Sequence, residues 1–188
     1  MMLKSFIERI ILFLRKIKYS FFSNNNNVKG SYKSYQPVVI RGVGKISFGN
    51  KVCFGVVNSQ GYYNSYAYIE ARTNESSIVF GNNIHINNGF SIVSEKRIIL
   101  GDNVLIGFNC QIIDSSFHDL RVDKRFFTDP NPKEVIIKNN VFIANNVTIL
   151  KGVTIGDNCV ISSGSVVTKS FPENVLIAGV PAKIVRQL

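Results

Sequence analysis

The chain has 188 residues, of which 45% are hydrophobic, and this length and composition suit one domain with a substantial apolar core. Lys and Arg outnumber Asp and Glu by 22 to 12, and the net charge of +10 favours anionic partners such as phosphates, acidic lipids, nucleic acid or acidic polysaccharides. Three cysteines without a CxxC pair argue against a disulfide framework and against a zinc site, and they indicate a reducing cytoplasm.

The first predicted element is an amphipathic helix from Met1 to Phe22, because apolar residues recur there at spacings of three and four. Lys and Arg residues occupy much of its remaining surface. No apolar run reaches the roughly 20 residues that a membrane crossing needs, and no small-residue cleavage site follows, so we do not expect a signal peptide. Two interpretations stay open: the helix packs on the protein or a partner subunit, or residues 1–22 contact the inner face of an anionic membrane.

A run of four asparagines, Asn24 to Asn27, follows this helix and is expected to act as a linker. It divides the chain into an N-terminal segment of residues 1–27 and a domain of residues 28–188, whose sequence is repetitive. Five short segments resemble one another: Phe48-Gly-Asn-Lys-Val52, Phe80-Gly-Asn-Asn-Ile84, Leu100-Gly-Asp-Asn-Val104, Ile137-Lys-Asn-Asn-Val141 and Ile155-Gly-Asp-Asn-Cys159. A finer period of six is marked by Ile137, Ile143, Ile149, Ile155, Ile161 and Val167.

A period of six predicts a β-solenoid. Three short strands make one triangular coil, and inward-facing aliphatic side chains stack on the next coil about 4.8 Å away. A helix is excluded because six is not a helical period and β-branched residues dominate. Asn, Asp and Gly suit the left-handed backbone conformations of the corners. Cys110 and Cys159 fall at the small-residue position of the repeat, so we expect them to be inert packing residues.

Two stretches carry a resemblance to a known family. The run Ile143-Ala-Asn-Asn-Val-Thr-Ile-Leu-Lys-Gly-Val-Thr-Ile-Gly-Asp-Asn158 resembles the hexapeptide repeat of the left-handed β-helix acyltransferases. The ending, with Gly164-Ser-Val-Val-Thr-Lys169, Pro172 and Ala178-Gly-Val-Pro-Ala-Lys183, is similar to that of the maltose and galactoside O-acetyltransferases and of the O-antigen and capsule acetyltransferases. The resemblance covers roughly residues 39–188.

This resemblance implies a mainly β protein, a left-handed parallel β-helix solenoid preceded by the N-terminal amphipathic helix. It also implies a cytoplasmic enzyme that transfers an acetyl group from acetyl-CoA to a sugar hydroxyl in surface polysaccharide (O-antigen or capsule) biosynthesis. The family implies a homotrimer with CoA between neighbouring subunits, and no metal or nucleic acid. The first 38 residues have no counterpart in the sugar acetyltransferases, and Phe142 and Ala144 stand where the family often has Trp and Gly.

His118 is the candidate general base. It lies in the longest interruption of the repeat, between Ile112 and Ile137, and loops that project from a rigid scaffold are where sites are built. A neutral imidazole can take the proton of a hydroxyl as it attacks a thioester, which typically contributes about 10² to 10⁴ in rate. From the residues alone, a lone loop histidine is more often simply solvated than catalytic; by resemblance, His118 matches the family's catalytic histidine. Asp114, Asp119 or a backbone carbonyl could orient its ring.

The other site residues follow from the same resemblance. Asn87 matches an asparagine that contacts the acceptor, although an ordinary corner asparagine is the simpler explanation. The positions that match the CoA site are Asn145, Ser163, Thr168, Lys169, Lys183 and Arg186. Their cationic members suit the phosphates of CoA. His85, the second histidine, is expected to point outward and to be structural.

Three other functions fit the sequence less well. A γ-class carbonic anhydrase would share the solenoid but needs three histidine ligands for zinc, and this chain has two histidines. Acyltransferases that use an acyl carrier protein lack the Val-Thr-Lys and Ala-Gly-Val-Pro ending. A non-catalytic scaffold would not require a histidine in the long interruption, and no recognised nucleic-acid motif is present. Within the same chemistry, serine or an antibiotic stays open as the acceptor.

Overall fold

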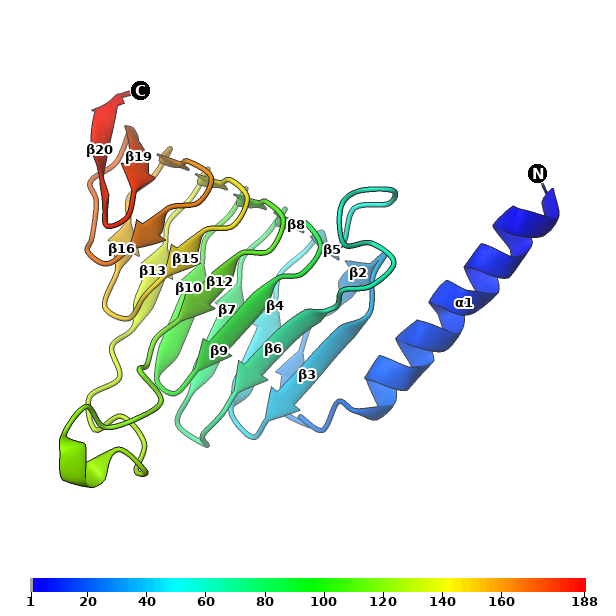
Figure 1. The fold of residues 1–188 in the computed structure, drawn as a ribbon, viewed down its shortest axis with the longest axis horizontal. Helices are drawn as coiled ribbons and strands as arrows, with labels where there is room; N and C mark the ends of the chain where they lie inside the picture. Colours follow the sequence, from blue (N-terminus) through cyan, green and yellow to red (C-terminus); the bar gives the residue numbers. More distant parts are fainter. Residues whose placement is uncertain (1) are drawn as a thin grey trace.

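The chain winds into a left-handed parallel β-helix with three flat sides, and the helix α1 projects from its N-terminal end (Figure 1). The computed structural model describes the backbone of residues 2–188 and the side chains of residues 6–188. Met1, the first residue of the predicted helix, lies outside the described residues. The solenoid predicted from the six-residue period is confirmed.

Each side of the prism is one sheet, and we number the sheets in the order in which the chain enters them. The first sheet contains β1 (Val28–Lys29), β4 (Lys45–Phe48), β7 (Ser77–Phe80), β10 (Arg97–Leu100), β13 (Val135–Ile137) and β16 (Thr154–Ile155). The second contains β2 (Tyr32–Ser34), β5 (Val52–Phe54), β8 (His85–Ile86), β11 (Leu105–Ile106), β14 (Phe142–Ile143), β17 (Val160–Ile161), β19 (Val175–Gly179) and β20 (Ala182–Gln187). The third contains β3 (Val38–Gly42), β6 (Ala67–Ala71), β9 (Ser91–Ser94), β12 (Gln111–Ile113), β15 (Thr148–Ile149) and β18 (Val166–Val167).

The core is the interior of the prism, because the same positions of each coil point inward. In the first sheet, Ile78, Ile98 and Val135 pair in register and are fully buried. Burying one such side chain contributes about 1.5–3 kcal/mol, so the stack is held mainly by this column and its counterparts on the other sheets. Ile46 continues this column into the N-terminal coils, which also bury aromatic rings, with Phe48 stacked on Phe80 at 4.9 Å between ring centroids.

The corner between the first and second sheets is built on an asparagine ladder. Each of its asparagines has a left-handed φ between 55° and 59°, a conformation that asparagine tolerates better than most residues. The side-chain Nδ2 of each of the first four donates to the Oδ1 of the asparagine in the next coil, at 2.8–3.2 Å. The members are Asn83, Asn103, Asn140, Asn158 and Asn174.

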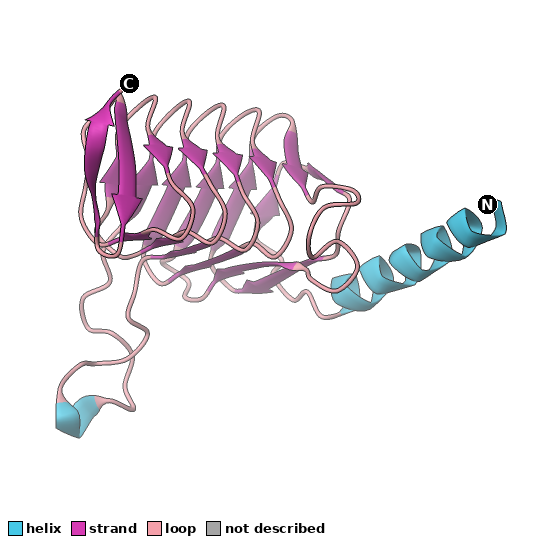
Figure 2. Ribbon diagram, turned by 45° about the horizontal axis from the view of Figure 1, so that its top comes forward, coloured by secondary structure: helices cyan, strands magenta, loops and turns pink. Residues whose placement is uncertain are grey.

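The helix α1 (Met2–Phe21) is followed by the asparagine run, which is bonded to the corner between β3 and β4. Asn25 Nδ2 donates to the carbonyl of Gly44 at 3.0 Å, and Asn27 Nδ2 donates to the carbonyl of Val43 at 2.7 Å. The run is therefore attached to the solenoid. Among the described residues, none of the helices combines the length and the apolar character needed to cross a membrane. The β19–β20 hairpin closes the opposite end of the stack with the antiparallel pair of the fold (Figure 2).

Candidate active site

The loop of residues 114–134 carries His118 and projects from the prism between β12 and β13 (Figure 2). It contains one 3-10 turn, η1 (Val122–Lys124), and leaves at the corner between the third and first sheets. Most of its tip is exposed to solvent. Its two arms, in contrast, are attached to the prism by buried polar groups.

Asp114 fixes the first arm. Its buried carboxylate accepts hydrogen bonds from Ser94 Oγ at 2.6 Å and from the backbone amides of Glu95 at 2.8 Å and Lys96 at 2.9 Å. Three donors satisfy a charge that would be costly to bury alone. The first residue of the loop is thus fastened to the corner of the preceding coil.

Asp129 fixes the second arm to the first. Its carboxylate accepts from the backbone amides of Ser116 at 2.8 Å and Asn131 at 3.0 Å, and forms an ion pair with Lys151, which follows β15. Burial alone would raise the pKa of Asp129, but the Lys151 ammonium and the two amides outweigh it and lower the pKa to about 2. The carboxylate is therefore ionised at neutral pH and holds both arms against the next coil.

Glu95 and Arg72 support the segment directly before the histidine. Glu95 is buried and accepts from Ser115 Oγ at 2.5 Å and Thr128 Oγ1 at 2.7 Å. Arg72 lies 3.7 Å from the Glu95 carboxylate and 4.4 Å above the ring of Phe117. Phe117 has a left-handed φ of 58°, which a bulky residue rarely adopts. These contacts hold a strained turn immediately before His118.

The ring of His118 is oriented by a backbone carbonyl. Its Nδ1 lies 2.8 Å from the carbonyl oxygen of Arg125 across the loop. Because a carbonyl oxygen only accepts, Nδ1 carries the proton, and the neutral ring presents its lone pair at Nε2. Asp114 is engaged with the preceding coil, and Asp119 with Arg121, whose guanidinium lowers the pKa of Asp119 to about 2. Of the three orienting groups open from the sequence, the backbone carbonyl is the one in contact.

A second group of candidate residues lies along the corner between the second and third sheets. Asn87, Asn145 and Ser163 occupy this corner in different coils. The Asn145 side chain accepts from the amide of Phe108 at 2.8 Å, and its backbone carbonyl accepts from Gly164 at 2.9 Å. Asn87 Oδ1 accepts from the next amide along the chain at 2.7 Å. The three residues form a ridge along this corner, in which Asn145 is bonded to the coils on both sides and Asn87 within its own turn.

The three cationic candidates and Thr168 are divided between the two corners. Lys183 lies near the tip of the β19–β20 hairpin, and this tip donates an amide to Ser165 Oγ at 3.3 Å, next to the Ser163 corner. Arg186 lies further along β20. Thr168 and Lys169 follow β18 and share the corner of the His118 loop. All four side chains are exposed.

One chain does not bring all these residues together. His118 and Lys169 lie on one corner of the prism, Asn87 and Asn145 lie on another, and the third sheet separates the two corners. Of the remaining sequence expectations, His85 points outward from β8 as predicted, and Cys110 and Cys159 are buried free thiols whose pKa is raised by burial. Among the residues described, no group of His, Cys, Asp and Glu could hold a metal ion.

Sequence reasoning missed the residues that anchor the loop. Three of these residues are far apart in the sequence: Glu95, Asp129 and Lys151. They lie beneath the same loop only because the register of the coils brings their segments together. The repeat breaks at Asp114, where a run of polar residues begins. This run could have indicated that the start of the loop is fixed to the solenoid by hydrogen bonds. The Arg125 contact uses a carbonyl that every residue has, so no side-chain pattern could indicate it.

The comparisons with known proteins agree with this architecture. The family described as bacterial transferase hexapeptide (six repeats) matches residues 134–169, the segment from β13 to β18. The chain is 30% identical to the Escherichia coli protein named "Putative lipopolysaccharide biosynthesis O-acetyl transferase WbbJ" over 159 residues, which cover 80% of this chain and 76% of that protein. The chain therefore belongs to the hexapeptide-repeat acetyltransferases.

Two further relatives describe the branch of this family. The galactoside O-acetyltransferase of Escherichia coli is 36% identical over 116 residues, which cover 60% of this chain and 55% of that enzyme. The chain thus spans about half the length of the galactoside enzymes that it matches. The solved structure of a galactoside acetyltransferase in complex with coenzyme A superposes with a TM-score of 0.53 at 25% identity, and covers 94% of this chain and 82% of that chain.

Proposed function

We propose that this protein transfers the acetyl group of acetyl-CoA to a hydroxyl of a sugar, in the assembly of a surface polysaccharide in the cytoplasm, and that residues 28–188 form the catalytic domain. The observation that carries the proposal is the histidine held with its Nδ1 on the Arg125 carbonyl and its Nε2 free on a projecting loop. Membership of an acetyltransferase family supports the reaction type.

His118 acts as the general base in this reaction. Nε2 takes the proton of the acceptor hydroxyl while the hydroxyl oxygen attacks the thioester carbonyl carbon of acetyl-CoA. The carbon–sulfur bond then breaks, the acetyl ester forms, and the imidazolium returns its proton to the thiolate of CoA. The Arg125 carbonyl stabilises the transient imidazolium through Nδ1–H and keeps the ring in the reactive tautomer.

The acetyl-CoA cosubstrate would be held by the second corner and by the cations of both corners. Asn145 and Ser163 present polar groups along the ridge, beside the backbone amides of two successive coils. Thr168, Lys169, Lys183 and Arg186 supply exposed hydroxyl, ammonium and guanidinium groups that fit the phosphates of CoA.

A complete site requires more than one chain, and we infer a homotrimer in which the His118 corner of one copy faces the Asn87 corner of its neighbour. The outward face of the second sheet supports this arrangement. Leu105 and Phe142 are neighbours there, 49% and 40% exposed, next to the ridge that bears Asn145. Apolar side chains on an outward sheet face favour a subunit contact.

The acceptor is assigned as a sugar from the relatives and from the site. The names of two relatives describe transfer to a galactoside and transfer in lipopolysaccharide biosynthesis. Asn87 offers an amide to a sugar hydroxyl from the neighbouring subunit of the trimer. Serine and antibiotics are the alternative acceptors.

The test measures the release of free CoA from acetyl-CoA with a panel of oligosaccharides, nucleotide sugars, serine and an aminoglycoside. We expect turnover with a glycan, and a loss of about 10²- to 10⁴-fold in His118→Ala with acetyl-CoA binding retained. His85→Ala removes the other histidine and is the matched control, which we expect to keep its turnover. Full activity in His118→Ala would refute the assigned base.

A further inference from the structure

The helix α1 contacts the solenoid through its polar side. Arg15 donates to the carbonyl of Ser65 at 2.8 Å and to that of Tyr62 at 3.3 Å, both in the loop between β5 and β6. Lys16 donates to the carbonyl of Ser34 at the end of β2, at 2.5 Å. Tyr19 lies on the same side and packs on the ring of Tyr66 at 4.7 Å between centroids. An amphipathic helix on a globular domain ordinarily turns its apolar face to the core, whereas most of the large apolar side chains of this helix face away from it.

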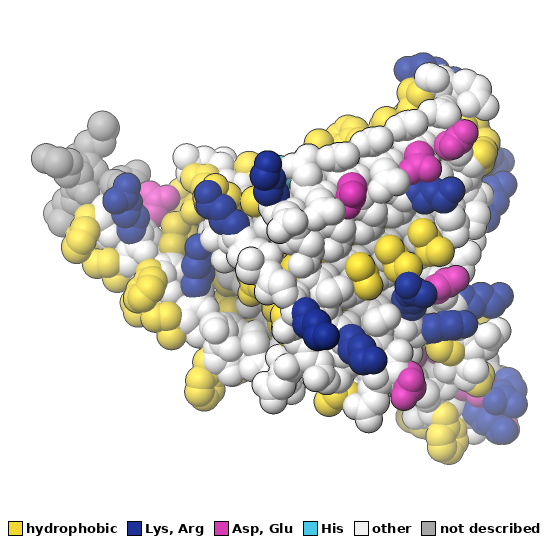
Figure 3. Space-filling model, turned by 180° about the vertical axis from the view of Figure 1, so that it is seen from behind, with side chains coloured by type: hydrophobic (Ala, Val, Ile, Leu, Met, Phe, Trp, Pro, Cys, Tyr) yellow, Lys and Arg dark blue, Asp and Glu magenta, His cyan; other side chains and the backbone are white. Residues whose placement is uncertain are grey.

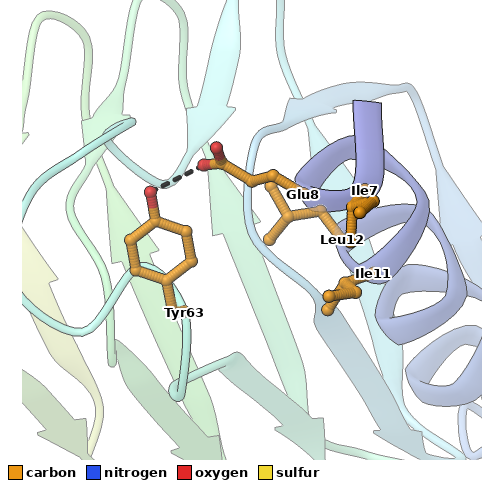
Figure 4. Close-up of a pocket in the computed structure, with 5 residues that line it drawn as sticks. All are labelled: Ile7, Glu8, Ile11, Leu12 and Tyr63. Atoms are coloured by element: carbon orange, nitrogen blue, oxygen red, sulfur yellow. Dashed lines mark hydrogen bonds between the residues drawn. The ribbon is translucent and has the colours of Figure 1, made fainter. Parts of the chain in front are cut away.

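Another polar contact on the same side of the helix spans a groove between the helix and the β5–β6 loop. Tyr63 Oη donates to Glu8 Oε1 at 2.6 Å across a cavity of about 450 Å³, which Ile7, Ile11 and Leu12 also line (Figure 4). The only acidic side chain of the described part of the helix is therefore engaged by the body of the protein. The helix is fixed in orientation by these contacts.

The opposite side of the helix is apolar and faces solvent. Its large side chains recur at spacings of three and four, so they form one continuous stripe. Their exposed fractions range from 42% to 84%. They are Phe6, Ile7, Ile10, Ile11, Phe13, Leu14, Ile17 and Phe21, of which Ile7 and Ile11 lie at the edge of the stripe and also line the cavity beside Tyr63. Figure 3 shows hydrophobic side chains gathered along the helix, with Lys and Arg side chains beside them.

The charged residues beside this stripe indicate which partner binds it. Arg9 and Lys18 are exposed, and Lys18 lies on the stripe itself, four residues after Leu14 and three before Phe21. A second copy of the helix would bring the same positive charges against these two residues. A bilayer interface instead accepts the apolar side chains among its acyl chains while the long Lys and Arg side chains reach the headgroups. Anionic headgroups complete the match.

We propose that α1 docks the protein on an anionic phospholipid surface, with the stripe from Phe6 to Phe21 inserted at the interface and Arg9 and Lys18 at the headgroups. The polar contacts of Arg15 and Lys16 hold the solenoid on the other side of the helix. The β19–β20 hairpin lies at the far end of the stack, so the docked protein keeps its candidate CoA residues in water (Figure 1).

The test is flotation of the full-length protein with vesicles of phosphatidylethanolamine and phosphatidylglycerol, compared with vesicles of phosphatidylcholine alone. We expect binding to the anionic vesicles that weakens as salt is added. The affinity of the double variant Phe13→Gln/Ile17→Gln for these vesicles should fall by about tenfold or more, since it removes two inserted side chains. Arg9→Gln/Lys18→Gln should lose about fivefold in affinity per cation.

Matched controls separate docking from misfolding and from the catalytic proposal. Lys138→Gln removes one charge on a distant corner and should bind vesicles like the unmodified protein. Acetyl transfer to a soluble acceptor should be unchanged in all helix variants. The proposal is overturned if the protein does not bind anionic vesicles, or if Phe13→Gln/Ile17→Gln still floats with them. It is also overturned if light scattering shows that the unmodified protein is an oligomer and that this variant is not. A second copy of the chain would then be what covers the stripe.

Discussion

The candidate base depends on neighbours that do not themselves react. The Arg125 carbonyl sets the tautomer of His118, while Asp129 and Lys151 join the two loop arms to the following coil. A loop with an exposed tip can hold a ring in a fixed place only when its base is immobile. The precision of the site is therefore located in the buried polar groups beneath the loop.

We expect Lys151→Gln to loosen this base. Without the ammonium, the loop arms lose an ion pair, and a small displacement of His118 should lower kcat about tenfold to 100-fold with a lesser effect on the KM for acetyl-CoA. Lys151→Arg keeps the charge and should retain most of the activity. Equal kcat in the Gln variant and the unmodified protein would show that the ion pair does not position the base.

The same ion pair predicts a shift in acid stability. The pKa of Asp129 in the folded protein is about 2, below the roughly 3.9 of an unperturbed aspartate. Its contribution to stability is therefore complete above about pH 5 and is lost as the pH falls toward 2. In Lys151→Gln the pKa of Asp129 rises, so unfolding should begin at a higher pH. Circular dichroism during acid titration measures the midpoint, and identical midpoints would contradict the assignment.

At the scale of elements, each corner is a stack of equivalent residues. The asparagine ladder combines a left-handed backbone with side-chain hydrogen bonds between successive coils. Two variants at one position separate these contributions. Asn140→Ala and Asn140→Gly both remove the side-chain amide, but only the alanine must bear the left-handed φ of 57°.

We therefore expect Asn140→Ala to be less stable than Asn140→Gly by about 1–2 kcal/mol. Urea unfolding followed by circular dichroism gives the two free energies. The glycine variant also has a more flexible unfolded chain, which reduces the difference. If the alanine and glycine variants are equally stable, tolerance of the left-handed backbone conformation is not the reason for asparagine at this corner.

Much of the fold could be predicted from residues that repeat, and less from those that do not. Ile137, Ile143 and Ile149 stand six apart and occupy the three sheets in turn, so their spacing predicts the prism. The spacing of α1 predicts an amphipathic helix but not its orientation, because the contacts of Arg15 and Lys16 are with backbone carbonyls. His118 was identifiable from the break in the repeat, whereas the Arg125 carbonyl was not.

For the whole molecule, the separation of His118 from Asn87 on different corners predicts complementation between chains. His118→Ala and Asn87→Ala should each be nearly inactive alone. When they are unfolded together and reassembled, about a quarter of the sites in random trimers would combine an intact His118 with an intact Asn87 from the neighbour. No recovery of activity in an assembled mixture would mean that each chain completes its own site.

A stack of parallel coils has no built-in limit, since each end leaves a row of amides and carbonyls that another solenoid could pair with, as fibres do. Here the two ends differ from the middle. Lys16 occupies a carbonyl on β2 at one end, and at the other β20 runs antiparallel, so no further parallel strand continues from it in the same register. At the second sheet, the addition of another solenoid is therefore opposed at both ends, which favours a particle of fixed length over a filament.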